Sequence, residues 1–130
     1  MNRERKKRLL QVVLVWGILL GAFVAFLLVR PPCVILQTTG LYCGGCGGSR
    51  MIEEFLRGNL WGAFRQNPYL FIALPLVGVY CLGEGICYVW EKRPLWKRRW
   101  IQVGLGVLVA VGLIFTLLRN LPGFEMLRPR

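Results

Sequence analysis

The stretch that decides the fold is Leu9–Val29, LLQVVLVWGILLGAFVAFLLV, in which 21 residues pass without a charge. A helix rises about 1.5 Å per residue, so about 20 apolar residues cross the roughly 30 Å hydrocarbon layer of a bilayer. Ile101–Leu118 adds 18 uncharged residues, and Tyr69–Trp90 carries one charge, at Glu84. The 130 residues are 55% hydrophobic. We therefore predict an all-α integral membrane protein, a single domain over 1–130 with three spans at about 9–29, 69–90 and 101–118.

Basic residues gather in two blocks beside these spans. The net charge is +11, and ten of the 17 Lys and Arg residues lie within residues 3–8 and 92–99. Cytoplasmic ends of spans carry such excesses, so we expect the N-terminus and the link 91–100 in the cytoplasm, and the segment 30–68 and the C-terminus outside it. The blocks are expected to attract anionic lipid headgroups, and their placement argues against nucleic acid as a partner. The long apolar core after the basic start predicts an uncleaved signal anchor.

The segment 30–68, between the first two spans, is too apolar to be a free loop. Apolar residues at helical spacing in 51–56 predict a short helix that Ser49 or a preceding glycine starts and Gly58 ends. A second apolar stretch covers 60–64, and Asn67-Pro68 is typical of an N-cap and a first-turn proline. We expect a turn around Cys43–Cys46, called here the Cys/Gly knuckle, followed by two short helices in the outer interface of the membrane.

The spacing of the residues in this segment follows a recognisable pattern: Cys33, then Thr39-Gly40, then Cys43-x-x-Cys46-Gly47-x-Ser49-Arg50, then Gly58, Ala63 and Asn67-Pro68. It resembles the signature C…TG-x-x-C-P-x-C-G-x-[ST]-R…G…A…NP of a family of small bacterial integral membrane proteins of unknown function. The resemblance implies a bacterial inner (cytoplasmic) membrane and no particular reaction. Gly44 stands where that family usually has proline, which predicts a looser knuckle.

Three chemistries compete for Cys33, Cys43 and Cys46. A disulfide from Cys33 to Cys43 or Cys46 would close a loop of about a dozen residues, worth about 3 kcal/mol, but leaves one thiol over. A zinc site fits Cys-x-x-Cys with Cys33 as third ligand. The chain has no histidine, so the fourth ligand would be Cys81, Cys87, a carboxylate such as Glu53, or a second subunit. Redox chemistry would use Cys43 and Cys46, yet no cofactor signature accompanies them.

Two further candidate sites depend on single features. The glycines with Ser49 and Arg50 at a helix start could bind an anion, although pairing of Arg50 with a glutamate one turn along explains the same residues. Glu84 lies inside the second span, where a carboxylate is costly and suggests a function. We expect it to hydrogen-bond Tyr80 or Tyr88, or to extend toward the basic link.

The expected function follows from what the chain lacks as much as from what it has. It has no Ser/His/Asp set, no paired catalytic carboxylates and no dinucleotide fingerprint. We therefore expect a non-enzymatic interaction or assembly protein whose knuckle is held by a disulfide or by zinc. The alternatives are a membrane thiol–disulfide oxidoreductase using Cys43 and Cys46, and a zinc- or anion-binding module. Small residues along the first span, at Gly17 and Gly21, serve either packing within the chain, contact with another membrane protein or a homo-oligomer.

Overall fold

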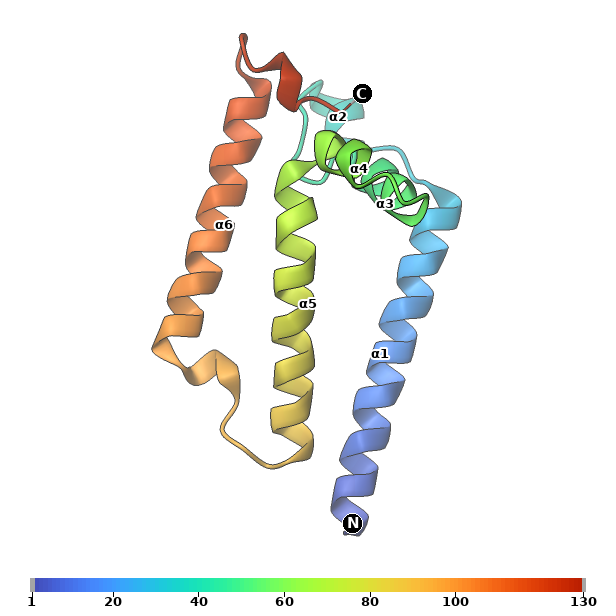
Figure 1. Ribbon diagram of the computed structural model, residues 1–130, viewed down its shortest axis with the longest axis vertical. Helices are drawn as coiled ribbons and strands as arrows, with labels where there is room; N and C mark the ends of the chain where they lie inside the picture. The colour runs from blue at the N-terminus through green and yellow to red at the C-terminus, as the bar shows by residue number, and fades with distance from the viewer. Residues whose placement is uncertain (1, 130) are drawn as a thin grey trace. The chain divides into compact units, whose positions relative to one another are not determined.

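The computed structural model describes residues 2–129 and is helical throughout its regular parts (Figure 1). Three long helices, α1 (Arg3–Val29), α5 (Pro68–Val89) and α6 (Arg99–Asn120), are long and apolar enough to cross a membrane. The short elements are α2 (Val34–Thr39), α3 (Gly48–Leu56), α4 (Leu60–Gln66) and the 3-10 turns η1 (Leu95–Lys97) and η2 (Glu125–Leu127). No strand occurs within residues 2–129. The all-α, three-span prediction is confirmed at the level of these helices.

The long helices extend beyond the apolar runs that predict them. The first helix begins at Arg3, six residues before Leu9, and the third runs from Arg99 to Asn120. Lys, Arg and Glu have good helix propensity, so a helix continues into polar flanks where hydropathy alone would end it. The two helices expected in 48–66 are present, with Gly47 as the cap of α3 and Asn59 accepting the Gly62 N–H at the start of α4. Helix α2 has no counterpart among the predicted elements.

Contacts divide the chain into two compact units. Unit 1 comprises Met1–Pro31 and Val77–Gly104, and unit 2 comprises Pro32–Leu76 and Leu105–Arg130. In unit 1, α1 packs on the second half of α5, because a Cβ at Gly85 would lie 3.4 Å from Val12. Tyr88 donates a hydrogen bond to Gln11 (3.0 Å), and Arg8 pairs with Glu91 (3.1 Å). The N-terminal basic block and the link after α5 therefore belong to the same unit.

Unit 2 contains all the buried residues of the described chain. Its core side chains come from the knuckle, the short helices and the adjoining parts of α5 and α6, and they are Cys46, Met51, Ala63, Asn67, Ala73 and Arg119. Tyr69 at the start of α5 donates to the Leu108 carbonyl of α6 (3.0 Å) and stacks on Phe115. The best-packed part of the chain is therefore the surroundings of the cysteines.

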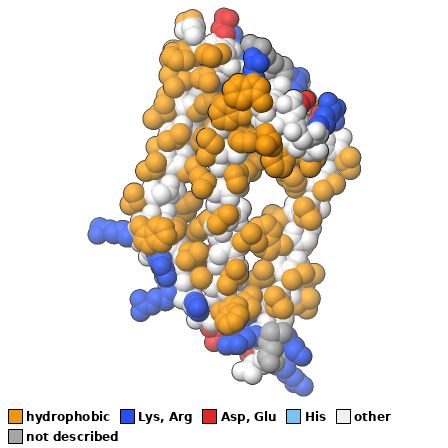
Figure 2. Space-filling view, in the orientation of Figure 1, with side chains coloured by type: hydrophobic (Ala, Val, Ile, Leu, Met, Phe, Trp, Pro, Cys, Tyr) orange, Lys and Arg blue, Asp and Glu red, His pale blue; other side chains and the backbone are white. Residues whose placement is uncertain are grey.

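The long helices carry exposed apolar surface along their length. Leu20 of α1 is 63% exposed, and Val79 of α5 is 70% exposed. Figure 2 shows these apolar side chains covering the helices, with Lys and Arg gathered near helix ends. Apolar surface exposed to this extent is typical of helices that contact a membrane or another protein. Within unit 1 nothing lies within 4 Å of a Cβ built at Gly17 or Gly21, so the packing within the chain expected there is not formed by this unit.

Candidate metal centre

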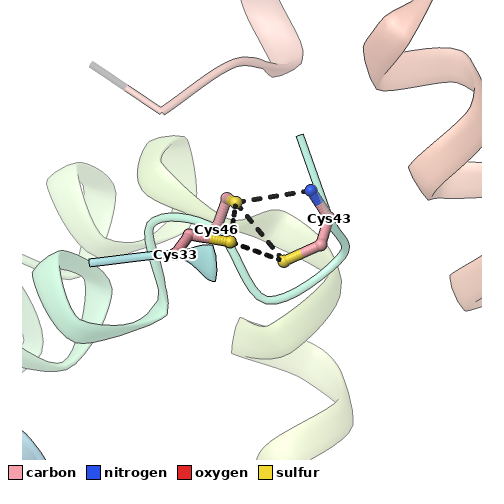
Figure 3. A group of neighbouring side chains, drawn as sticks. All are labelled: Cys33, Cys43 and Cys46. Atoms are coloured by element: carbon pink, nitrogen blue, oxygen red, sulfur yellow. Dashed lines mark hydrogen bonds between the residues drawn. The ribbon is translucent and has the colours of Figure 1, made fainter. Parts of the chain in front are cut away.

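The three predicted cysteines lie together as a nearly equilateral triangle of sulfurs (Figure 3). The Sγ–Sγ distances are 3.4 Å for Cys33–Cys43, 3.3 Å for Cys43–Cys46 and 3.2 Å for Cys46–Cys33. A disulfide bond is about 2.05 Å long, so all three are separate thiols. No pair is closer than the others by more than 0.2 Å. The arrangement therefore favours no particular disulfide.

A tight turn and a short helix start place these sulfurs. Cys33 directly precedes α2. The Cys46 N–H donates to the Cys43 carbonyl (3.1 Å), and the Cys43 N–H donates to Cys46 Sγ (3.3 Å). Gly47 follows with φ +84°, and a Cβ there would meet the Gln66 carbonyl at 2.9 Å. Only glycine fits both that backbone conformation and that contact.

Asn67 clamps the knuckle from the start of α5. Its side chain is fully buried. Its Nδ2 donates to the carbonyls of Gly44 (2.8 Å) and Cys46 (3.2 Å), while its Oδ1 accepts the Leu70 N–H (3.0 Å). The N-cap predicted from Asn67-Pro68 is therefore present, and the same amide also fixes the cysteine turn. Gly44 packs so closely on α6 that a Cβ there would lie 2.9 Å from Thr116 Oγ1.

Arg119 is a buried cation that the sequence analysis missed. Its side chain has no exposed surface, and its guanidinium donates to the carbonyls of Cys43 (3.1 Å) and Gln66 (3.4 Å). It lies over the rings of Tyr42 (5.8 Å) and Phe115 (5.4 Å). No carboxylate of residues 2–129 pairs with it.

The thiols differ in acidity because their surroundings differ. Burial, followed by the hydrogen bonds to its neighbouring thiols, raises the pKa of Cys46 to about 12. The Leu36 N–H at the start of α2, followed by the Cys46 thiol, lowers the pKa of Cys33. A thiolate is the form that binds metal, and three thiolates at this separation require a cation among them. Without such a cation, Cys46 stays protonated at neutral pH.

The donor set fits a soft metal ion. Zinc bound by thiolates at about 2.3 Å in a tetrahedron sets its sulfurs about 3.8 Å apart, so the three would separate by roughly 0.5 Å. Thiolate ligands select zinc or copper(I) over harder cations. Within the described residues the group holds three ligands. Of the expected fourth ligands, Glu53 instead pairs with Arg57 (2.6 Å), and neither Cys81 nor Cys87 belongs to the group.

Ser49 and Arg50, the predicted anion site, lie in the first turn of α3. Neither belongs to the metal-ligating group. Glu53 and Glu54, the pairing partners expected for Arg50, form ion pairs with Arg57 at 2.6 and 3.7 Å, and these pairs do not exclude a further one with Arg50. Anion binding at this turn stays a prediction.

Glu84 holds the link between α5 and α6. Its Oε2 accepts the Leu95 N–H at 2.7 Å. Of the arrangements expected for Glu84, this bond corresponds to extension toward the link, whereas Tyr88 donates to Gln11 on α1. A backbone N–H is a good partner for a carboxylate near a helix end, since it satisfies two polar groups at once. This carboxylate therefore has a structural role in unit 1.

The comparison with known protein families matches the segment of the chain that contains the knuckle. Residues 33–83 match the family described as Protein of unknown function (DUF2752), and they make up 51 of the 130 residues. The matched segment contains Cys33, Cys43, Cys46 and Asn67. No curated protein and no solved structure matches the chain. The similarity therefore supports the segment as a unit of sequence and assigns no activity to it.

Proposed function

We propose that this is a bacterial inner-membrane protein that binds one zinc ion through Cys33, Cys43 and Cys46. The observation that carries the proposal is that the three Sγ–Sγ distances are nearly equal, at 3.2–3.4 Å. A disulfide would single out one pair and draw it more than about 1 Å closer. The ion would tie the start of α2 to the turn before α3, and so hold the knuckle in shape.

The buried charge of Arg119 supports the metal over the disulfide. Three thiolates and one Zn²⁺ carry one net negative charge, which balances the guanidinium that the Cys43 carbonyl holds at 3.1 Å. A disulfide with one remaining thiol carries no charge. It would leave a fully buried arginine without a counter-ion, which is costly.

The role proposed for the zinc is structural support of an interaction or assembly protein. Three protein ligands leave one coordination position for an outside donor, whereas a closed structural site has four. A donor from a partner protein, or from a second copy of the chain, would complete the site. The absent histidine removes the usual general base, which favours this role over an enzymatic one.

The proposed orientation places the N-terminus in the cytoplasm and the knuckle outside it. The Arg8–Glu91 ion pair supports one location for both basic blocks, since it joins the N-terminal block to the link after α5. A reporter that is active only outside the cytoplasm should be active when fused after Arg130 and inactive when inserted in the link 91–98. The reverse pattern would refute this orientation.

The zinc proposal is tested by metal content and thiol state. We expect about one zinc per chain in the full-length protein purified in detergent, and loss of that zinc in Cys33→Ser, Cys43→Ser and Cys46→Ser. The matched control is the double variant Cys81→Ser/Cys87→Ser, which should keep its zinc. Intact mass after alkylation of the unfolded chain should show every thiol free. Zinc-free protein with a disulfide among the three would refute the proposal and favour thiol–disulfide chemistry.

A further inference from the structure

A basic cavity in unit 1 is the feature that the proposed function does not use. The link between α5 and α6 forms a cavity of about 610 Å³ lined by Arg93, Pro94, Lys97 and Arg98. This volume lies in the range of small-ligand sites, about 300–1,000 Å³. The cavity lies wholly within unit 1. Its location is independent of the cysteine cluster.

The backbone around the cavity has a defined conformation. Glu84 accepts the Leu95 N–H, and this bond anchors the turn η1 to α5. Within the turn, the Lys97 N–H donates to the Pro94 carbonyl (3.3 Å) and the Arg98 N–H donates to the Leu95 carbonyl (2.9 Å). These bonds hold the backbone that carries the three basic side chains in one conformation.

Among the described residues, no acidic side chain forms an ion pair with the basic residues that line the cavity. The described glutamates of this unit are engaged elsewhere: Glu4 with Lys7 (3.5 Å), Glu91 with Arg8 (3.1 Å) and Glu84 with the Leu95 N–H. Over residues 2–129, the three cations of the cavity form no ion pair with a carboxylate. All three are exposed. They concentrate positive potential on one small site.

We propose that this cavity binds the phosphate headgroup of an anionic glycerophospholipid. Two arginines offer the forked donor geometry that matches phosphate oxygens, and Lys97 adds a third cation.

A lipid is favoured over a free anion by the place of the link, which joins two helices able to span the membrane. Trp90, Trp96 and Trp100 around the link are 58%, 51% and 67% exposed. Exposed tryptophans are typical of the headgroup level. The inference rests on the membrane insertion in the proposed function and not on the zinc.

Native mass spectrometry of the full-length protein in neutral detergent tests the proposal. Phosphatidylglycerol and phosphatidylcholine are titrated separately, and the first-bound lipid is followed. The test variant is Arg93→Gln/Lys97→Gln/Arg98→Gln. The charge-matched control is Arg3→Gln/Lys6→Gln/Lys7→Gln, which removes three cations from the N-terminal block. About 1 kcal/mol per cation near an anionic surface is about fivefold, so three cations give about 100-fold as an upper limit. We therefore expect the test variant to bind phosphatidylglycerol about 10- to 100-fold more weakly.

The control variant should bind the first phosphatidylglycerol within about threefold of the wild-type protein, and phosphatidylcholine should bind weakly to all three proteins. Equal loss in both variants would show general charge attraction and would overturn the cavity as the site. Competition by millimolar inorganic phosphate would overturn the lipid as its ligand. The charge-conserving variant Arg93→Lys/Arg98→Lys keeps the cations but loses the forked donors, so it should bind more weakly than the wild-type protein and more tightly than the test variant. Binding as weak as in the test variant would overturn the contribution of charge at this site.

Membrane insertion is examined separately by alkaline carbonate extraction of membranes. Protein released from the membrane would refute the proposed function itself. Protein retained in the membrane that nonetheless shows no preference for phosphatidylglycerol would refute only the headgroup site. The two failures are therefore distinguishable.

Discussion

Replacing Arg119 with methionine should weaken zinc binding far more than the same change at an exposed arginine. Arg119 is fully buried and donates to the carbonyls of Cys43 (3.1 Å) and Gln66 (3.4 Å). A hydrogen bond from a charged group contributes about 1.5–3 kcal/mol. Both bonds are present with or without zinc, so their loss lowers the stability of the fold. For zinc affinity itself we expect the loss typical of removing a group that orients and balances metal ligands, about 10- to 100-fold.

The assay is competition for zinc between the detergent-solubilised protein and a chromophoric chelator. Arg65→Met is the matched control, since Arg65 is exposed on α4 in the same unit and should change the affinity by less than about 0.5 kcal/mol. Arg119→Lys keeps the charge without the fork, so it should fall between the wild-type protein and Arg119→Met. A methionine variant that binds zinc as tightly as the Arg65 control would refute the reasoning that the guanidinium balances a charged thiolate site.

Three other outcomes are expected. Asn67→Ala removes the clamp on the turn and leaves buried carbonyls unpaired, so the free energy of unfolding measured by circular dichroism should fall by about 2–4 kcal/mol; an unchanged transition would contradict the clamp. In zinc-free protein at about pH 7–9, Cys33 should be alkylated first of the three clustered cysteines, because its lowered pKa gives more thiolate. Cys46 should be alkylated last, because its pKa is raised to about 12. Peptide mass spectrometry measures the order, and a different order would contradict these acidities. Glu84→Leu should speed hydrogen exchange at the Leu95 N–H, whereas Glu84→Gln, which keeps an acceptor, should change it little.

The fold was largely predictable because long uncharged runs admit few structures. Leu9–Val29 can satisfy its backbone in a membrane only as a helix, and α1 covers it completely. Asn67-Pro68 likewise carries its capping chemistry in its local sequence, and α5 begins at Pro68. Helix α2 was not predicted, since six residues contain too little periodicity to be recognised.

The candidate site was only partly predictable, because its geometry depends on contacts between distant residues. The cysteine spacing identified the three ligand candidates, but not the distances between their sulfurs. Arg119 stands at the end of an apolar run, where a basic residue is ordinary at the membrane interface. Its burial arises from the Cys43 carbonyl, 76 positions away in the sequence. A single arginine following the last span, next to Asn120, was the available signal.

Asn120 has a consequence for how deeply the knuckle can be immersed. Its side-chain amide accepts the Tyr42 N–H (2.8 Å) and donates to the Tyr42 carbonyl (2.8 Å), as a neighbouring strand would. Asn67 and Arg119 satisfy the carbonyls of residues 43, 44 and 46 in the same way. Irregular backbone tolerates a water-free environment only when protein groups replace its hydration. Around the cysteine turn these groups are supplied by Asn67, directly before α5, and by Arg119 and Asn120 of α6, so the carbonyls at these positions stay paired where water is absent.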